Sequence, residues 1–389
     1  TPPEGRSGAE GRVGIELEWI AVPRDGDTSP SPEALAALLP STLPGASRLT
    51  FEPGGQLELS GPAGRDLAAA CTAMRADTSC VRDCLDRAGL DLVGTGLDGR
   101  GERPRVLDAS RYRAMEQYFD TQWPAGRTMM RHSAAIQVNL DVGPRAGVDP
   151  RWRLAHDIGP VLAACFANSP FDTSGAPTGF RSTRLAVWAA IDTARTNPAM
   201  RRPGAGASAD WTRYLLDAPV MMIRVGDECR MADRARMTLA DWVTDGHPLG
   251  WPTTDDVNYH LTTLFPPVRP RGWLELRMID ALPEEWWPVA VAVATALLDD
   301  PDASARAVRA TAGVRNEWQA ASRDALGHPG LHAAALECFD AARDALSRLP
   351  ADPATVAAAA RYSERYVERG RCPADDQLDE WSQLRTARV

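Results

Sequence analysis

Four short segments of the chain carry polar side chains, most of them acidic or carboxamide, at alternate positions. They are residues 13–20, 56–60, 136–141 and 273–278. Successive side chains of a β-strand point to opposite faces, so each segment predicts a strand with one polar face and one apolar face. The polar positions are Glu16, Glu18, Gln56, Glu58, Gln137, Asn139, Asp141, Glu275 and Arg277.

The second of these segments belongs to a predicted hairpin at residues 51–62. Its turn is Pro53-Gly54-Gly55, where proline presets φ and glycine accepts a positive φ. Glu52 stands directly before the turn, and Glu58 lies in the strand after it. The hairpin therefore presents acidic side chains on both sides of its turn.

Polar residues exposed to water on a half-buried sheet are the ordinary explanation of any one alternating strand. Four strands that offer carboxylates and carboxamides favour instead an acidic face that lines a cavity, with helices over the apolar face. Carboxylates gathered in one cavity repel one another and shift towards protonation unless cations are present. Their oxygens suit hard ions such as Mg²⁺ or Mn²⁺, and Mg²⁺ usually shares its shell with phosphate, so a nucleotide is the predicted ligand.

The content and order of these motifs resemble the glutamate–cysteine ligases of the plant and bacterial type. The resemblance covers residues 11–285 and is closest to the actinobacterial branch, which makes γ-glutamylcysteine for ergothioneine. The motifs that carry it are residues 14–18, 53–61, 129–131, 137–141, 168–171, 259–269 and 274–277.

This resemblance implies an α+β, glutamine synthetase-like carboxylate–amine ligase fold, in which a curved, mostly antiparallel sheet forms a funnel with helices outside. It implies that ATP drives the joining of the L-glutamate γ-carboxylate to the amine of L-cysteine, through γ-glutamyl phosphate. Three alternatives stay open: a different acceptor amine, supply of the product to glutathione, and a non-catalytic relative that senses nucleotide or glutamate.

The resemblance also implies roles for individual acidic and amide residues. Two or three Mg²⁺ ions, or Mn²⁺, would be held by Glu16, Glu18, Glu52, Glu58 and Glu275. Gln137 would join them at a position where relatives can have a histidine, which leaves its role as a metal ligand open. Asn139 would complete a metal shell or contact substrate. Arg277 would stabilise the transferring phosphoryl group, with Glu275 beside it as the second catalytic residue.

Arginine must do all the cationic work in this chain, because its 43 basic residues include no lysine. A planar guanidinium can meet a carboxylate through two hydrogen bonds. The resemblance implies that one of Arg131, Arg184 and Arg195 binds the α-carboxylate of glutamate, and that Arg113 and Arg277 contact ATP. For Arg113, Arg184 and Arg195, a solvated arginine is the alternative.

Composition limits the classes of partner. The net charge of −9 argues against nucleic acid or an anionic membrane as the main partner. No segment resembles the apolar part of a signal peptide and no apolar run reaches 18 residues, so we expect a cytoplasmic enzyme. The seven cysteines form no C-x-x-C motif and are expected to be free thiols. We expect small-molecule partners, and a monomer or a small homo-oligomer.

We expect one catalytic domain at residues 1–389, with the active site in a sheet-bearing core at 11–285 and a helical part at 286–389 packed on it. Apolar patterns predict helices at 65–88, 111–118 and 151–167, and four or five more after residue 284.

Other segments carry narrower expectations. The resemblance predicts a strand at 214–225. A mobile loop over the site is expected at 197–210, and residues 1–10 are expected to be disordered or ordered only by packing. Met221 and Met222 are expected in the core, and His260 is expected to make a structural hydrogen bond.

Overall fold

The computed structural model describes residues 11–25, 29–199, 206–232 and 236–387. Its main sheet has seven strands in which every pairing is antiparallel, in the order β2-β3-β1-β5-β9-β8, with β4 paired to the second half of β1. The strands are β1 Val13–Pro23, β2 Arg48–Phe51, β3 Leu57–Ser60, β4 Leu90–Val93, β5 Ala135–Asp141, β8 Val268–Pro270 and β9 Trp273–Asp280. The expected α+β class with a mostly antiparallel sheet is confirmed, and the described sheet is open.

Strand β1 is the centre of this sheet, because it pairs with β3, β4 and β5. Its alternate residues Ile15, Leu17 and Trp19 are each at most 2% exposed. They form part of the apolar face that the sequence predicts, and the glutamates between them point to the other face.

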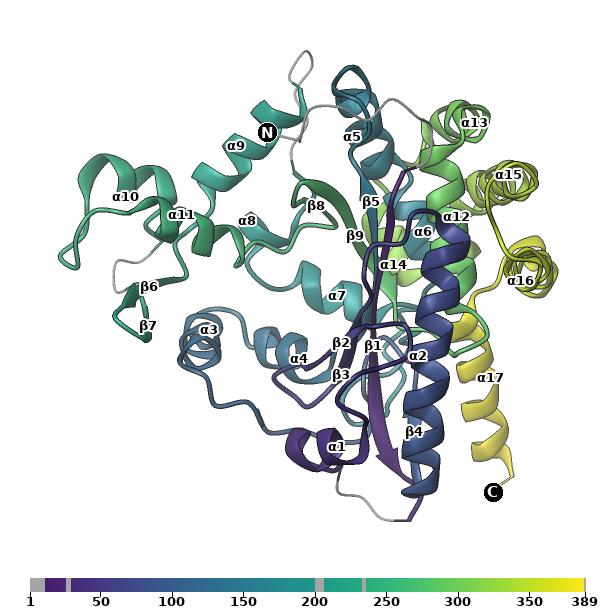
Figure 1. The fold of residues 1–389 in the computed structure, drawn as a ribbon, viewed down its shortest axis with the longest axis horizontal. Helices are drawn as coiled ribbons and strands as arrows, with labels where there is room; N and C mark the ends of the chain where they lie inside the picture. The colour runs from purple at the N-terminus through teal and green to yellow at the C-terminus, as the bar shows by residue number, and fades with distance from the viewer. Residues whose placement is uncertain (1–10, 26–28, 200–205, 233–235, 388–389) are drawn as a thin grey trace.

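A layer of helices covers the apolar face of the sheet (Figure 1). Helix α2 packs on β1, α12 packs on β5, and α6 packs on β9. Helix α12 is buried from Trp287 to Leu298, because α13, α15 and α16 enclose it on the side away from the sheet. The helices of this layer are α2 Leu67–Arg87, α6 Gly159–Cys165, α12 Trp287–Asp299, α13 Pro301–Thr311, α15 Pro329–Leu346, α16 Pro353–Arg365 and α17 Pro373–Thr386.

Shorter helices lie on the opposite, polar side of the sheet, and an extension projects beyond them (Figure 1). The helices near the sheet are α3 Ser110–Asp120, α4 Ala125–His132, α7 Thr183–Ala189 and α8 Thr193–Thr196, and α14 Trp318–Arg323 packs between α6 and α7. The extension consists of α9 Ala207–Asp217, β6 Met222–Val225, β7 Glu228–Met231, α10 Leu239–Asp245 and α11 Thr254–Leu261. The remaining helices are α1 Pro32–Leu38 and α5 Val148–Asp157.

Three expectations about elements differ from the structure. The expected helix at 151–167 is divided into α5 and α6, because Pro160 has no N–H to continue the hydrogen-bond ladder. The expected strand at 214–225 begins as the last turn of α9 and is a strand only from Met222. The part after residue 284 has six α-helices where we expected four or five, since prolines start new helices there.

Several local expectations are confirmed. Met221 and Met222 are buried, and the seven cysteines are free thiols. His260 is 4% exposed, and its Nε2 lies 3.3 Å from the carbonyl oxygen of Leu215. Burial lowers the pKa of His260 to about 3. Within the described ranges, none of the helices has the length and apolar content needed to cross a bilayer. Residues 1–10, and 200–205 of the expected mobile loop, lie outside the described residues.

The turn of the β2–β3 hairpin makes a close backbone contact that generates a stability prediction. A Cβ atom on Gly54 would lie 2.0 Å from the carbonyl oxygen of Arg131. We expect Gly54→Ala to push the hairpin away from α4 and lower the free energy of unfolding by about 1–3 kcal/mol, measured by chemical denaturation. Gly313→Ala is the matched control, because a Cβ there meets nothing within 4 Å. Equal stability of the two variants would contradict the close contact.

Candidate active site

A cavity of about 1190 Å³ lies over the polar face of the sheet. Its floor is formed by side chains of β1, β2, β3, β5, β8 and β9, and its walls come from α3, α4, α7 and α14. The lining includes four of the predicted glutamates: Glu16, Glu18, Glu52 and Glu58. The structure therefore brings together residues that lie far apart in the sequence.

Strand register places the acidic side chains on neighbouring strands. Glu18 lies directly opposite Glu58 in the β1–β3 pair, and Glu16 lies opposite Gln137 in the β1–β5 pair. Side chains of directly opposed residues are close enough to interact. Because all these positions have the same parity along their strands, the carboxylates share one face of the sheet.

Carboxamides hold two of these carboxylates in place. Glu18 accepts hydrogen bonds from the backbone N–H of Ala135, at 2.8 Å, and from Nε2 of Gln137, at 3.1 Å. Glu16 accepts from Nδ2 of Asn139 at 2.8 Å. The two predicted carboxamides therefore contact the glutamates directly.

The glutamates of the cavity floor are unfavourable in their charged form unless a positive charge lies nearby. Burial raises the pKa of Glu18 to about 7, and the charge of Glu58 adds to that shift. Burial also raises the pKa of Glu16, with a contribution from Glu275, and it raises the pKa of Glu52 well above its ordinary value, with Glu18 and Glu58 contributing. These carboxyl groups therefore favour either protons or bound cations near neutral pH.

The chemistry of this donor set fits a hard divalent cation, because it offers carboxylate and amide oxygens. Among the described residues, however, no three His, Cys, Asp or Glu side chains already converge as a metal-binding group. Glu58, for example, accepts hydrogen bonds from Oγ of Ser60 at 2.7 Å and Oγ1 of Thr50 at 3.1 Å. A bound ion would have to replace such contacts.

The neighbouring half of the cavity floor is basic. Arg269 and Arg277 line the cavity, and Glu275 lies behind them with 1% of its side chain exposed. Nη2 of Arg269 donates to Glu275 at 3.0 Å, and Nη1 of Arg277 lies 3.3 Å from its other oxygen. Burial opposes the charge of Glu275, but Arg277 and Arg269 outweigh it and lower its pKa. Arg277 also donates to Oε1 of Gln137, which joins the basic and acidic halves.

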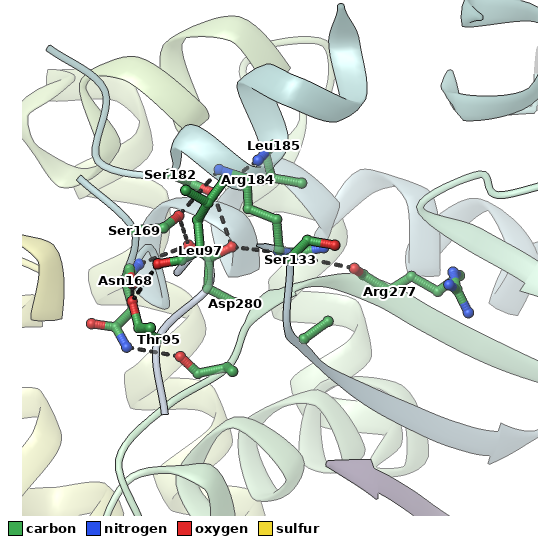
Figure 2. Close-up of polar contacts among 12 residues, drawn as sticks. Thr95, Leu97, Ser133, Asn168, Ser169, Ser182, Arg184, Leu185, Arg277 and Asp280 are labelled. Carbon is green, nitrogen blue, oxygen red and sulfur yellow. Dashed lines mark hydrogen bonds and ion pairs between the residues drawn. The ribbon is translucent and has the colours of Figure 1, made fainter. Parts of the chain in front are cut away.

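Of the three arginines considered for the glutamate carboxylate, Arg184 lines the cavity. Its side chain extends towards Asp280 and the backbone of Arg277 (Figure 2). Arg131 instead pairs with Glu116 and donates to the carbonyl of Arg103.

Arg195 and Arg113 are placed away from the cavity lining. Arg195 is fully buried, and its N–H groups bond to Asp192, Thr263, Tyr118 and Pro219. These contacts use its five donors, so its placement fits a structural role. Arg113 is a partly exposed residue of α3 that pairs with Asp108 and Glu228.

Four arginines that the sequence reasoning did not assign also line the cavity: Arg48, Arg111, Arg269 and Arg271. Two of them had a signal in the sequence. Arg48 and Thr50 alternate immediately before Glu52, and Arg269 closes the motif at 259–269. Arg111 lies in the predicted helix at 111–118, whose basic residues the resemblance places near ATP, but the prediction chose Arg113 from that segment and the structure places Arg111 in the cavity lining. It donates to the hydroxyl and the carbonyl of Thr262, both at 2.9 Å.

One wall of the cavity is apolar and rich in methionine. Met115, Met129 and Met130 line it, together with Trp188 and Phe265. The rings of Trp188 and Phe265 pack edge to face, with their centroids 5.7 Å apart. Polarizable thioethers and aromatic rings suit an apolar or planar part of a ligand. The cavity thus combines an acidic floor, a basic floor and an apolar wall.

The raised pKa of Glu18 generates a prediction for the metal-free protein. A carboxyl group with a higher pKa in the folded state stabilises the fold at low pH, and this stability is lost as pH rises from about 4.5 through about 7. In EDTA, the free energy of unfolding of the parent protein should fall by up to about 3 kcal/mol as the pH rises through this range. We expect Glu18→Gln to remove this fall, so that its free energy of unfolding depends less on pH between about pH 5 and 8. The exposed Glu364→Gln is the control. The same slope in Glu18→Gln and the parent protein would refute the assignment.

Comparison with known proteins places the chain in a family. The model of glutamate–cysteine ligase family 2 matches residues 12–387. The chain is 42% identical to the glutamate–cysteine ligase EgtA of Mycolicibacterium smegmatis over 381 residues, which are 96% of this chain and 88% of that protein. It is 43% identical to EgtA of Mycobacterium tuberculosis, over 96% of this chain and 86% of that protein.

A solved structure supports the fold alone. The Francisella tularensis glutamate–cysteine ligase, in complex with AMP, matches with a TM-score of 0.57 and 14% identity, over 96% of this chain and 85% of that one. Together with the match along almost the whole chain, the mycobacterial relatives establish the family. The chain belongs to glutamate–cysteine ligase family 2.

Proposed function

We propose that the protein uses ATP to join the γ-carboxylate of L-glutamate to the amine of L-cysteine, giving γ-glutamylcysteine, ADP and phosphate. The observation that carries the proposal is the cavity floor, where carboxylates of β1 and β3 lie beside arginines of β8 and β9. Transfer of a phosphoryl group to a carboxylate gathers several negative charges in one place. Catalysis then needs mainly charge neutralisation and alignment.

Two or three Mg²⁺ ions, with Mn²⁺ as a substitute, would be held by Glu16, Glu18, Glu52 and Glu58, with Gln137 beside them. When bound, such ions neutralise phosphate charge and offset the burial and repulsion that raise the glutamate pKa values. Glu275 would join this set only by exchanging its arginine partners for an ion. In the arrangement seen, it holds Arg269 and Arg277 in place.

The basic residues would act on the substrates. Arg277 and Arg269 would contact the phosphates of ATP and stabilise the transferring group and the acyl phosphate. Arg184 would receive the α-carboxylate of glutamate, since it lines the cavity and Arg131 and Arg195 are engaged elsewhere. Asn139, already bonded to Glu16 and to the indole of Trp273, would orient the floor from the β5 side.

A second candidate is ligation of glutamate to a different amine. It is favoured by the apolar wall of Met115, Met129 and Met130, which offers space and polarizable contact but no single side chain dedicated to a thiol. ADP release measured with L-cysteine and with a panel of other amines, with products identified by mass, separates the two. Release stimulated equally by other amines would move the function to the second candidate.

The biological setting follows from the same proposal. Supply of γ-glutamylcysteine to ergothioneine is supported by the resemblance to the actinobacterial branch, whereas supply to glutathione would use identical chemistry. We place the protein in the cytoplasm, where both amino acids and ATP are available. A monomer or small homo-oligomer stays a prediction, as does the division into a sheet-bearing core and a helical part within one catalytic domain.

Removal of the Arg277 guanidinium is expected to slow the chemistry more than binding. With Arg277→Gln, kcat for ADP release with glutamate and cysteine should fall by about 10²–10³-fold, because a charge aimed at the transferring group is lost. Arg127→Gln, which alters an exposed ion pair with Asp120, is the control and should keep its activity. A kcat for Arg277→Gln within a few-fold of the parent value would exclude Arg277 from the transition state.

The metal proposal predicts a loss of ion binding that can be measured without turnover. We expect Glu16→Gln and Glu58→Gln each to weaken Mn²⁺ binding at least about 10-fold. The binding is measured in the presence of ADP from the electron paramagnetic resonance signal of free Mn²⁺. The exposed Glu364→Gln should bind Mn²⁺ as the parent protein does. Unchanged Mn²⁺ binding in both cavity variants would remove these residues from the metal site.

A further inference from the structure

Asp280 is a buried carboxylate at the end of β9 that none of the roles above uses. Its residue is 1% exposed, and it accepts four hydrogen bonds. The backbone N–H of Asn168 and Oγ of Ser169 donate to Oδ2 at 2.9 and 2.7 Å, and Oγ of Ser182 and Nε of Arg184 donate to Oδ1 at 3.0 and 2.7 Å (Figure 2). The carboxylate is therefore fixed from two sides.

The contacts of Arg184 leave one side of its guanidinium uncommitted. Nε bonds to Asp280, and Nη2 donates to the carbonyl oxygen of Arg277 at 3.2 Å. Within the described part of the chain, Nη1 has no hydrogen-bond partner, so three of the five N–H donors remain for a ligand. Arg184 lines the cavity, so these donors belong to the side chain that a ligand there would meet.

The surroundings of Asp280 prevent it from swinging away. A Cβ atom on Gly96 would lie 2.4 Å from Cγ of Asp280, which shows how closely this backbone covers the carboxylate. Asn168 is held in turn by Gln377 of α17, whose Nε2 donates to its side-chain oxygen at 2.5 Å. Segments that are remote in the sequence thus hold one carboxylate, which holds one arginine of the cavity.

From this geometry we propose that Asp280 is a positioning residue, which orients Arg184 so that its free N–H groups receive the α-carboxylate of the amino-acid substrate. The proposal rests on the proposed function, because it takes glutamate as the substrate whose carboxylate Arg184 meets. A buried arginine with a fixed plane binds a carboxylate with less loss of side-chain freedom than a mobile one. Asp280 supplies that fixed plane and balances the buried positive charge.

The pair Asp192 and Arg195 shows what a purely structural arrangement looks like in the same protein. Asp192 is also 1% exposed and accepts from Nε of Arg195 at 2.7 Å. All five donors of that arginine are used within the fold, whereas Arg184 keeps three. The two pairs therefore form a matched test and control.

Steady-state kinetics of the full-length protein test the proposal. We expect Asp280→Asn to raise the KM for L-glutamate at least about 10-fold, because the charged contact that orients Arg184 is lost, while the KM values for ATP and L-cysteine change less than about 3-fold. Asp192→Asn should lower the melting temperature but leave the glutamate KM within about 3-fold of the parent value. Equal increases in all three KM values for Asp280→Asn would overturn the positioning role.

A double-mutant cycle tests whether Asp280 acts through Arg184. In an Arg184→Gln background, Asp280→Asn should change the glutamate KM less than about 3-fold further, because the residue that it positions is already gone. Independent, multiplying effects of the two changes would overturn the proposal. Should Asp280→Asn not fold, Asp280→Glu keeps the charge but displaces the carboxylate from Nε of Arg184; an unchanged glutamate KM in that variant would also overturn the proposal.

Failure of the underlying function gives a different result. If the parent protein shows neither glutamate-dependent ADP release nor L-glutamate binding by calorimetry, the proposed function is wrong and the role of Asp280 is overturned with it. If the parent protein uses glutamate with a measurable KM and Asp280→Asn leaves that KM unchanged, only the positioning role is overturned.

Discussion

The burial of several like charges on one face of a sheet is the physical constraint on which the rest of this structure depends. Glu18 and Glu58 stand directly opposite each other on paired strands, and Glu16 and Glu52 share the same cavity. Their burial and, to a smaller extent, their mutual repulsion oppose folding, as the raised pKa values of Glu16, Glu18 and Glu52 indicate. The apolar face of the same strands must therefore supply enough stability to hold them together.

That stability comes from the helical layer. Helix α12 is buried along nearly its whole length between the sheet and α13, α15 and α16. Such an element contributes apolar burial from almost every side chain, which is the dominant favourable term in folding. The apolar burial of the helical C-terminal part thus offsets the free-energy cost of the acidic floor. Through the hydrogen bond between Gln377 and Asn168, this part also contacts the residues that hold Arg184.

The sequence alone predicted the sheet face well and the arginines poorly. A period of two, which strand geometry imposes, placed Glu16, Glu18 and Glu58 on one face of their own strands. Their meeting in one cavity also depends on which strands pair and in what register, which the structure supplies. Arg131, Arg184 and Arg195 could not be ranked, because the reach and partners of a long side chain depend on packing from distant segments. Glu116 pairs with Arg131 across 15 positions of the chain, which no local pattern reports. Asp192 and Arg195 are three residues apart, but the burial of Arg195 depends on distant partners such as Thr263 and Pro219. The division of α5 from α6 could have been predicted from Pro160, whereas the start of the segment at 214–225 continues α9 as its last turn and was not predicted.

The cavity has another property that follows from its cations being guanidinium groups. An acyl phosphate is an electrophile that reacts with any free amine, and a lysine side chain beside it would risk covalent self-modification. The chain contains no lysine, and a guanidinium stays protonated and is a poor nucleophile even where burial lowers its pKa to about 10, as at Arg269. Under the proposed function, no side chain of the protein carries a primary amine that could compete with the incoming substrate for the activated carboxylate. Arginine therefore lets the cavity be strongly cationic while remaining chemically inert towards its own intermediate.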